Sequence, residues 1–185
     1  MSLVEHEPEI LFPVNQLRLF GYNKYFNIFD KMCQNESLPN VILLNGLKGS
    51  GKATFAYHFI NYLLSVDEED SYSKNNFTIN SNNKSYKLLQ DQTHPNFFLL
   101  DNIISESDIK VDQARSLIKY LNKSTYSKDL KIVMIDNAEY LNLNASNAIL
   151  KALEEPPKNT FFFIIQNSSS PIIDTIKSRC IEFKI

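Results

Sequence analysis

Residues 45–56 read NGLKGSGKATFA, and their glycines are spaced as in a phosphate-binding loop. The usual pattern is G-x-x-x-x-G-K followed by Ser or Thr. In such a loop, consecutive backbone N–H groups curl around a phosphate, the lysine reaches the β- and γ-phosphates, and the last hydroxyl binds Mg²⁺. The residues of this chain at these positions are Gly46, Gly49, Ser50, Gly51, Lys52, Ala53 and Thr54.

The hydroxyl position departs from this pattern, because Ala53 follows Lys52 and Thr54 comes one residue late. One step along a helix rotates a side chain by about 100°, so Thr54 cannot simply replace the missing hydroxyl. A glycine-rich turn that binds nothing is the alternative interpretation. We expect the loop of a nucleotide-binding ancestor, and a present-day affinity for ATP or ADP that is weak or absent.

A second group of chemical interest follows the apolar run 132–135. In P-loop hydrolases such a strand ends in an Asp that holds Mg²⁺, and a neighbouring residue positions the attacking water. Here Asp136 is followed by Asn137, whose amide can orient a water but cannot accept its proton. Glu139 stands two residues further, where its direction cannot be predicted. Alone, Asp136 reads as a strand-end carboxylate; with the loop upstream, we interpret it as the metal-binding acid of the ancestor.

Asn167 and Arg179 are the remaining candidates. Asn167 ends an apolar run, and two interpretations are equally good: a polar sensor of the γ-phosphate, or the first residue of the turn NSSSP. Arg179 is one of only three arginines beside 16 lysines. A planar guanidinium suits phosphate or carboxylate better than lysine does, so an arginine finger acting in trans is one hypothesis. An ordinary surface arginine is the other.

The elements that must position these residues alternate along the chain. Continuous apolar runs predict buried strands at 41–45, 96–101, 131–136, 160–167 and 181–185. Helical spacing predicts helices at 23–34, 55–64, 111–122 and 145–155, with a short one near 172–176. This alternation predicts an α/β fold with a mainly parallel five-stranded sheet flanked by helices. The order strand, glycine loop, helix is the context that a phosphate-binding loop requires.

Length and composition suit one ordinary domain of 185 residues. We divide the chain into an N-terminal segment over 1–22 and a domain over 23–185. Within the domain, 65–92 is rich in Asn, Ser, Asp and Lys and has few periodic apolar residues. It is therefore predicted to be a long polar surface loop or a partly ordered insertion, because these residues are too few for a core element.

Charge and cysteine content narrow the functional class. The net charge of −2 excludes a global basic field, so nucleic acid can be contacted only through a local patch or inside an assembly. Cys33 and Cys180 are too far apart in sequence for a zinc knuckle or a disulfide framework. No signal peptide is recognisable, and no run approaches the ~18 apolar residues of a membrane span. We expect a cytoplasmic protein with no membrane contact.

The phrase NAILKALEEPP, the phenylalanine-rich strand after it and TIKSRC resemble the AAA+ module of bacterial DNA polymerase III clamp-loader subunits. HPNFFLLD and IKVDQARSL are also similar, and the resemblance runs from about Leu17 to the end, most weakly over 65–92. It implies a P-loop AAA+ core. The family continues into a lid and a collar, and this chain stops at Ile185, so we expect a fragment or truncated form without them.

Within that family, active gamma/tau-type subunits carry a hydroxyl and an acidic pair where this chain has Ala53 and Asn137. The chain therefore looks more like the delta-prime type, which does not drive hydrolysis, and GKAT is similar to the alphaproteobacterial form. No intrinsic ATPase is expected, although the resemblance implies a subunit of a DNA-directed DNA polymerase holoenzyme. The alternatives are an active gamma/tau-type clamp-loader ATPase and another AAA+ nucleotide-binding module.

The resemblance also implies partners. They are gamma/tau and delta subunits, the sliding clamp, and primer–template DNA, which is reached through the assembly. Arg179 would act in trans on ATP bound by a neighbouring gamma subunit. DNA phosphates would be met by helix N-termini such as those near Val111 or Asn144. Modules of this group often carry a four-cysteine zinc site after the P-loop helix, but 65–92 contains no cysteine, so no zinc is predicted.

Overall fold

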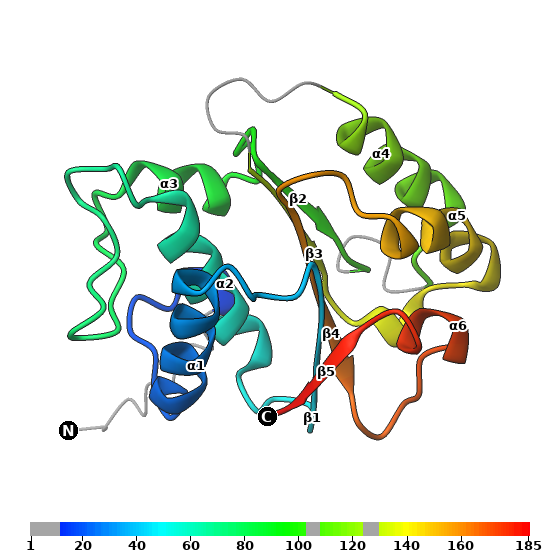
Figure 1. Cartoon of the computed structure of the whole chain (residues 1–185), viewed down its shortest axis with the longest axis horizontal. Helices are drawn as coiled ribbons and strands as arrows, with labels where there is room; N and C mark the ends of the chain where they lie inside the picture. Colours follow the sequence, from blue (N-terminus) through cyan, green and yellow to red (C-terminus); the bar gives the residue numbers. More distant parts are fainter. Residues whose placement is uncertain (1–11, 103–107, 124–129) are drawn as a thin grey trace, which may run out of the picture.

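A five-stranded sheet lies between two groups of helices (Figure 1). The computed structural model describes residues 12–102, 108–123 and 130–185. The strands, ordered β2-β3-β4-β1-β5 and parallel at every pairing, are β1 (Val41–Gly46), β2 (Phe97–Leu100), β3 (Lys131–Ile135), β4 (Thr160–Asn167) and β5 (Ile181–Lys184). The predicted α/β fold with a mainly parallel five-stranded sheet is confirmed.

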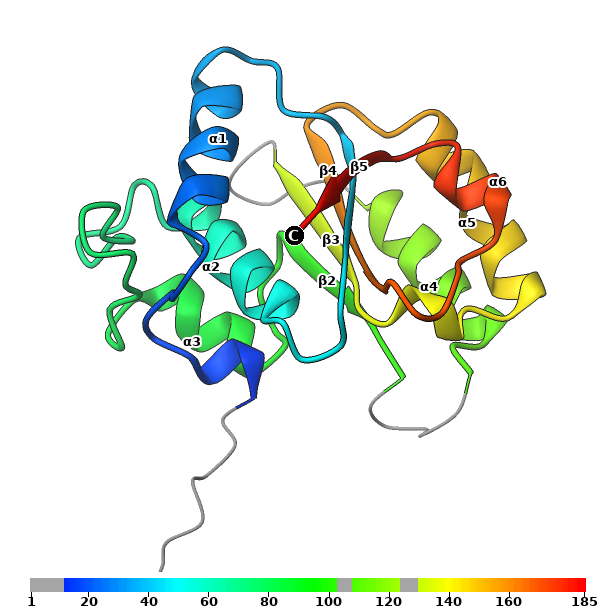
Figure 2. The ribbon, with the colours of Figure 1, turned by 90° about the horizontal axis from the view of Figure 1, so that it is seen from below.

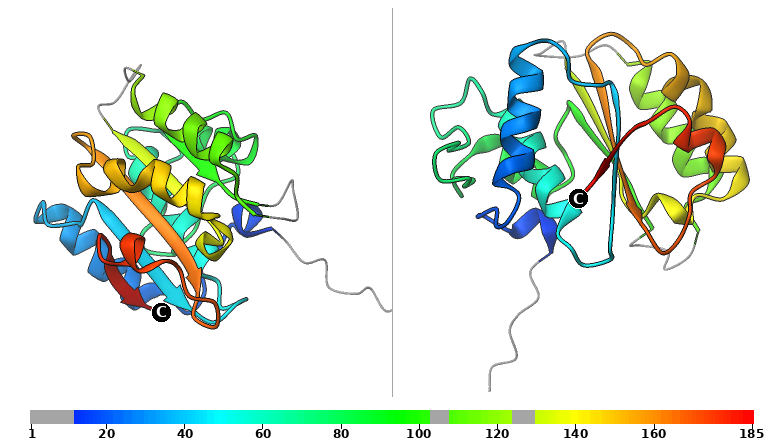
Figure 3. Two further views of the ribbon diagram at one scale, coloured as in Figure 1. Left: turned by 90° about the vertical axis from the view of Figure 1, so that its right-hand side faces the viewer. Right: turned by 60° about the horizontal axis from the view of Figure 1, so that its bottom comes forward.

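The helices cover both faces of the sheet, and Figures 2 and 3 show the same three layers from other sides. On one face lie α1 (Asn23–Gln34), α2 (Lys52–Leu64) and α3 (Lys84–Gln90). On the other lie α4 (Val111–Leu121), α5 (Leu143–Glu154) and α6 (Asp174–Lys177). Two short 3-10 helices, η1 (Pro13–Asn15) and η2 (Ala138–Tyr140), precede α1 and α5.

Each central strand supplies both layers of the core, because side chains alternate across a strand. In β1, Ile42 and Leu44 belong to the core beneath α1–α3, whereas Val41 and Leu43 belong to the core beneath α4–α6. This explains why the strand reads as a continuous apolar run and not as an alternating one. β4 follows the same rule, with Phe162 fully buried beneath α4–α6.

The sheet order brings the carboxyl ends of β1, β3 and β4 together at one edge. β1 pairs with β4 so that Gly46 stands opposite Asn167. β4 pairs with β3 so that Ile164 stands opposite Ile135, immediately before Asp136. In open parallel sheets ligands bind outside this edge, and the glycine-rich loop, Asp136 and Asn167 lie there.

The N-terminal segment packs against the domain. Leu19 is 3% exposed and belongs to the core beneath α1–α3. Its backbone N–H donates to the carbonyl of Phe77 at 2.9 Å, and Arg18 forms an antiparallel bridge with Thr78. Residues 12–22 and the middle of the 65–92 segment therefore lie side by side. The first eleven residues of the predicted N-terminal segment lie outside the described part.

The structure differs from the predicted polar surface loop or partly ordered insertion over 65–92 in two respects. The segment contains α3, and it contributes four buried side chains to the core beneath α1–α3, namely Tyr72, Ile79, Tyr86 and Leu89. Polar residues hold the rest of its turns together. Asn83 is fully buried, its side-chain oxygen accepts hydrogen bonds from the Tyr86 N–H and the Asn61 amide, and its own amide donates to the Asp70 carbonyl.

Candidate nucleotide site

The predicted phosphate-binding loop connects β1 to α2 at the carboxyl edge of the sheet. Gly49 and Gly51 have φ angles of +76° and +92°, in the left-handed region that glycine adopts without steric cost. Gly51 is also the N-cap of α2, so the positive end of that helix faces the loop. Beside it is a hollow of about 370 Å³, lined by Pro13, Lys48, Gly49, Gly51, Lys52, Ala53, Thr54, Asp136, Asn137, Ile165 and Asn167.

Lys52 is folded back onto the loop that carries it. Its Nζ donates to the carbonyl oxygens of Gly46 at 2.9 Å and Leu47 at 2.5 Å, and the side chain is 5% exposed. Burial lowers the pKa of Lys52, while the carboxylates of Glu139 and Asp136 act in the opposite direction. The positive charge of the Lys52 ammonium group is therefore only partly compensated in the loop. A phosphate bound there would stabilise that charge.

Ala53 and Thr54 begin α2 and both line the hollow. Thr54 also lines a neighbouring hollow of about 280 Å³, formed with Gln16, Arg18, Leu19, Phe20, Tyr22, Ser50 and Gly51. Thr54 thus stands at the boundary of two hollows. Ala53 presents only a methyl group to the site, so the position of the usual Mg²⁺-binding hydroxyl offers no oxygen.

Asp136 leaves the end of β3 and points into the same hollow. Burial, together with the nearby carboxylates of Asp101 and Glu139, raises the pKa of Asp136 to about 6. The hydrogen bond from the Asn137 backbone N–H, 2.9 Å long, and the charge of Lys52 partly oppose that shift. A carboxyl group in this setting favours a bound cation, because the cation would offset the unfavourable burial of its charge.

Asn137 has a left-handed backbone, with φ 54° and ψ 52°. Asn tolerates this region better than Glu and most other residues, because its short side chain can hydrogen-bond locally. The Asn137 amide donates to the Asn102 side-chain oxygen at 3.3 Å. The position that would carry a carboxylate for hydrolysis is therefore occupied by a residue that suits this turn.

The sequence could not place Glu139, which the structure puts at the site. Its Oε2 accepts a hydrogen bond from the backbone N–H of Asn167 at 3.2 Å, which ties η2 to the end of β4. The Asn167 side-chain oxygen accepts from the Ser169 N–H at 3.1 Å. Asn167 therefore lines the hollow and also shapes the turn after β4, so both of its sequence-based interpretations remain compatible with its position.

Tyr22 supports the loop and was not singled out from the sequence. Its hydroxyl donates to the Ser50 carbonyl at 2.6 Å, and its ring stacks on Phe55 with centroids 5.4 Å apart. Pro13, from the N-terminal segment, lines the hollow as well. No local pattern marks either residue, because their roles arise from contacts with elements distant in the chain.

Arg179 lies apart from this group. It follows α6, on the face of the sheet opposite α2 (Figure 1), and it is not among the residues that line the hollow. Its Nη1 donates to the Thr175 carbonyl at 2.7 Å, and its Nη2 donates to Glu154 Oε2 at 3.2 Å. The structure thus brings together the loop, Asp136, Asn137 and Asn167, and it leaves Arg179 elsewhere on the surface.

The donor set of the hollow fits a phosphate. Lys52, the glycine-rich turn and the N-terminal end of α2 all present positive charge or N–H groups there. Asp136 supplies an acid at the facing strand end. The same site supplies no hydroxyl at Ala53, so it fits a nucleotide phosphate better than it fits the usual Mg²⁺ complex.

A sequence model described as "DNA polymerase III, delta subunit" matches residues 21–185. The chain belongs to that family. A relative in Pseudomonas aeruginosa named DNA polymerase III subunit delta-prime is 35% identical over 140 residues, 76% of this chain and 41% of the relative. The chain spans about two fifths of the length of such curated delta-prime relatives.

Solved structures agree on the fold of this member of the delta subunit family. A gamma subunit-related protein of DNA polymerase III from Thermotoga maritima superposes with a TM-score of 0.55, covers 88% of this chain and 44% of its own, and is 21% identical. The Holliday junction branch migration motor RuvB of the same organism gives a TM-score of 0.54 over 94% of this chain and 49% of its own, at 14% identity. At these identities the likeness concerns the fold alone.

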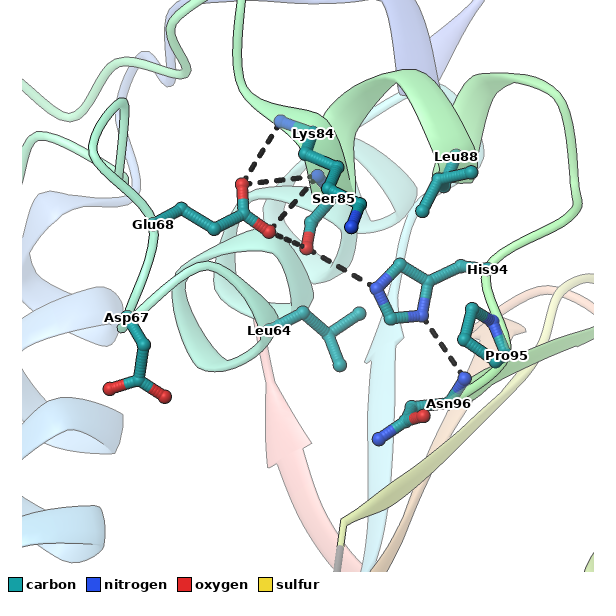
Figure 4. A pocket seen from close by; sticks show the side chains of 9 residues that line it. All are labelled: Leu64, Asp67, Glu68, Lys84, Ser85, Leu88, His94, Pro95 and Asn96. Atoms are coloured by element: carbon teal, nitrogen blue, oxygen red, sulfur yellow. Dashed lines mark hydrogen bonds between the residues drawn. The ribbon is translucent and has the colours of Figure 1, made fainter. Parts of the chain in front are cut away.

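A second hollow of this family member lies where α2, α3 and β2 meet, away from the loop (Figure 4). Ser85 stands between Glu68 and His94, with its Oγ 2.5 Å from Glu68 Oε1 and 3.2 Å from His94 Nε2. The Asn96 backbone N–H donates to His94 Nδ1, so Nε2 carries the ring proton and donates to Ser85. The histidine therefore cannot accept a proton from Ser85, whose hydroxyl donates to Glu68 instead, and these contacts tie α3 to Glu68 and His94.

Three further expectations concern metals, helix ends and membrane spans. Among residues 12–102, 108–123 and 130–185, no group of three or more His, Cys, Asp or Glu side chains is placed to hold a metal ion. The N-terminal ends of α4 and α5, near Val111 and Asn144, lie side by side, because Ile109 and Leu141 form a parallel bridge. Across the described ranges, no helix is long and apolar enough to cross a membrane.

Proposed function

We propose that this chain is the nucleotide-site domain of a delta-prime-type clamp-loader subunit that does not hydrolyse ATP itself. The observation that carries the proposal is a formed phosphate loop with Ala53 at the hydroxyl position and Asn137 at the position of the hydrolytic carboxylate. In this proposal the subunit acts during DNA replication with gamma/tau and delta subunits, and the assembly loads the sliding clamp onto primed DNA. The delta-prime names of its relatives support this.

Arg179 is the residue that we propose to act on ATP, in trans. It lies outside the chain's own hollow, and 28% of its side chain is exposed. In the assembly it would meet the phosphates of ATP held by an adjacent gamma-type subunit and stabilise the charge that develops there. Primer–template phosphates would be met by the paired helix ends near Val111 and Asn144.

Replacing Arg179 with alanine tests the function. In a clamp loader reconstituted with the full-length protein, we expect Arg179→Ala to assemble normally and to lower single-turnover ATP hydrolysis at the adjoining site by roughly 10²-fold or more. Arg115→Ala is the matched control, because Arg115 is exposed on α4 and, among the described residues, its ion pair is with Asp112 three residues away. Unchanged hydrolysis with Arg179→Ala would remove the trans role.

A second measurement addresses the chain's own loop. We propose that ATP or ADP binds there weakly, through Lys52 and the loop N–H groups, without requiring Mg²⁺, because Ala53 offers no ligand to the ion. Equilibrium binding of ADP and ATP with and without Mg²⁺ should give similar affinities. A strong Mg²⁺ requirement, or ATP turnover of the protein with DNA and clamp at about 1 s⁻¹ or above, would instead favour the gamma/tau-type ATPase.

A further inference from the structure

Glu154 is the only side chain among the described contacts that forms an ion pair with Arg179. The two residues are 25 positions apart, and they meet because α5 and α6 pack side by side on the same face of the sheet. Glu154 is the last residue of α5, which cannot continue through Pro156 and Pro157. The end of the helix therefore fixes where this carboxylate emerges.

Both ends of the contact rest on buried residues. Leu153, one position before Glu154, is 2% exposed, and Ile176, next to Thr175, is fully buried. Cys180 Sγ further ties the turn after α6 to the Ile176 carbonyl at 3.1 Å. The carboxylate of Glu154 and the carbonyl of Thr175 thus come from two different helices, each beside a buried residue.

The guanidinium group is oriented at two points and still has donors to spare. Nη1 donates to the Thr175 carbonyl and Nη2 donates to Glu154. A guanidinium has five N–H donors, so two contacts leave three. One of the three, the Nε–H, is buried without an acceptor among the described residues, so the two remaining N–H groups, on Nη1 and Nη2, would meet a further anion. A planar cation held in this way is suited to a further anion.

The ion pair contributes little to folding. The side chain of Glu154 is 61% exposed and that of Arg179 is 28% exposed, and exposed pairs contribute about 0–1 kcal/mol. The contact therefore matters more for orientation than for stability. Orientation of a charged group affects a transition state strongly, because small misplacements lower the rate steeply.

We propose that Glu154 is a positioning residue for Arg179, holding its guanidinium toward the phosphates of a nucleotide on the neighbouring subunit. The proposal rests on the trans role proposed above for Arg179. Glu154 itself does not touch the nucleotide. Its removal should lower the rate of the chemical step and leave ATP affinity almost unchanged.

The first test needs no activity. With only three arginines in the chain, the side-chain Nε–H signals can be resolved by ¹⁵N NMR of the full chain. In Glu154→Ala, the Arg179 Nε–H should become more mobile and exchange faster with water, while the signals of Arg18 and Arg115 stay unchanged. Glu155→Ala is the matched control, because it removes an exposed carboxylate one position further along. An unaltered Arg179 signal in Glu154→Ala would overturn the positioning role.

The second test uses the reconstituted clamp loader. Glu154→Ala should lower kcat of the adjoining site roughly tenfold, with little change in KM. Glu154→Gln should recover part of this loss, because it keeps an acceptor oxygen. Glu155→Ala should match the wild type. In an Arg179→Ala background, Glu154→Ala should have no added effect. An equal loss in that background, or no loss in the wild-type background, would overturn the proposal. Unchanged hydrolysis in Arg179→Ala would overturn the trans role of Arg179 instead. The NMR result on Glu154→Ala is independent of that outcome, because it reports only the mobility of the Arg179 side chain.

Discussion

Asn137 has a left-handed backbone at the position where ATP-hydrolysing P-loop proteins commonly carry a carboxylate. At φ 54°, a residue with a longer side chain costs about 1–2 kcal/mol more than one that tolerates this region. Placing Glu at 137 to restore a hydrolytic carboxylate would thus introduce strain in the turn between β3 and η2. Asn137→Glu together with Ala53→Thr is therefore not expected to create an efficient ATPase.

Asp136 provides a residue-scale prediction with a defined pH range. Its pKa is raised to about 6, chiefly by burial, against an unfolded value of 3.8. Between these values the folded state binds more protons than the unfolded state, so this group costs stability that grows as pH rises and is complete above about 6. Asp136→Asn should therefore stabilise the domain by about 1–3 kcal/mol at pH 7.5 and by much less near pH 4.

Chemical denaturation of both proteins across this pH range measures the effect. Asp112→Asn is a suitable control, because the Asp112 side chain is 84% exposed and its removal should shift stability by less than about 0.5 kcal/mol. A loss of stability in Asp136→Asn at pH 7.5 would show that hydrogen bonding at the strand end outweighs the burial of its charge.

At the scale of elements, α3 is held by a buried polar residue and not by a long apolar face. The Asn83 side chain caps the helix through the Tyr86 N–H at 2.6 Å and joins it to α2 through the Asn61 amide at 2.9 Å. His58 of α2 makes a comparable link. Its Nε2 lies 3.0 Å from the Gln16 carbonyl and its Nδ1 lies 3.0 Å from the Tyr72 hydroxyl.

Asn83→Ala should destabilise the protein by about 2–4 kcal/mol, because it removes a helix cap and leaves the Asn61 amide and the Asp70 carbonyl without their partner. Hydrogen exchange should show the loss concentrated in 65–92. Asn82→Ala, at the exposed neighbouring position, should change stability by less than about 0.5 kcal/mol. Equal effects of the two substitutions would mean that the cap at 83 has no special part in holding the segment.

The same elements show how far the sequence predicts the fold. β4 was predicted over its observed range, 160–167, and α1 over 23–34, because apolar periodicity is a local signal. The helix α3 was missed since its seven residues offer only Tyr86 and Leu89 as buried apolar side chains. Its position depends on contacts with α2 and the N-terminal segment, and no window of local sequence contains those partners.

At the scale of the whole molecule, the sequence predicted those site residues that belong to a motif at the carboxyl end of a strand. The loop, Asp136 and Asn167 come together because parallel strands end at one edge of the sheet. Glu139 and Tyr22 were not predictable, because each reaches the site through a contact with a residue 28 positions away. The separation of Arg179 from the hollow follows from α6 lying on the opposite face.

The position of β1 within the sheet has a consequence for synthesis. Within the described part of the chain, its strand neighbours are β4, which begins at Thr160, and β5, which begins at Ile181. While a ribosome has released only the first half of the chain, the apolar strand that leads into the phosphate loop has nothing to pair with. Such long-range pairing is slow and leaves nascent apolar segments open to aggregation. The glycine-rich loop after β1 is thus made early but acquires its shape only when nearly all of these residues have emerged.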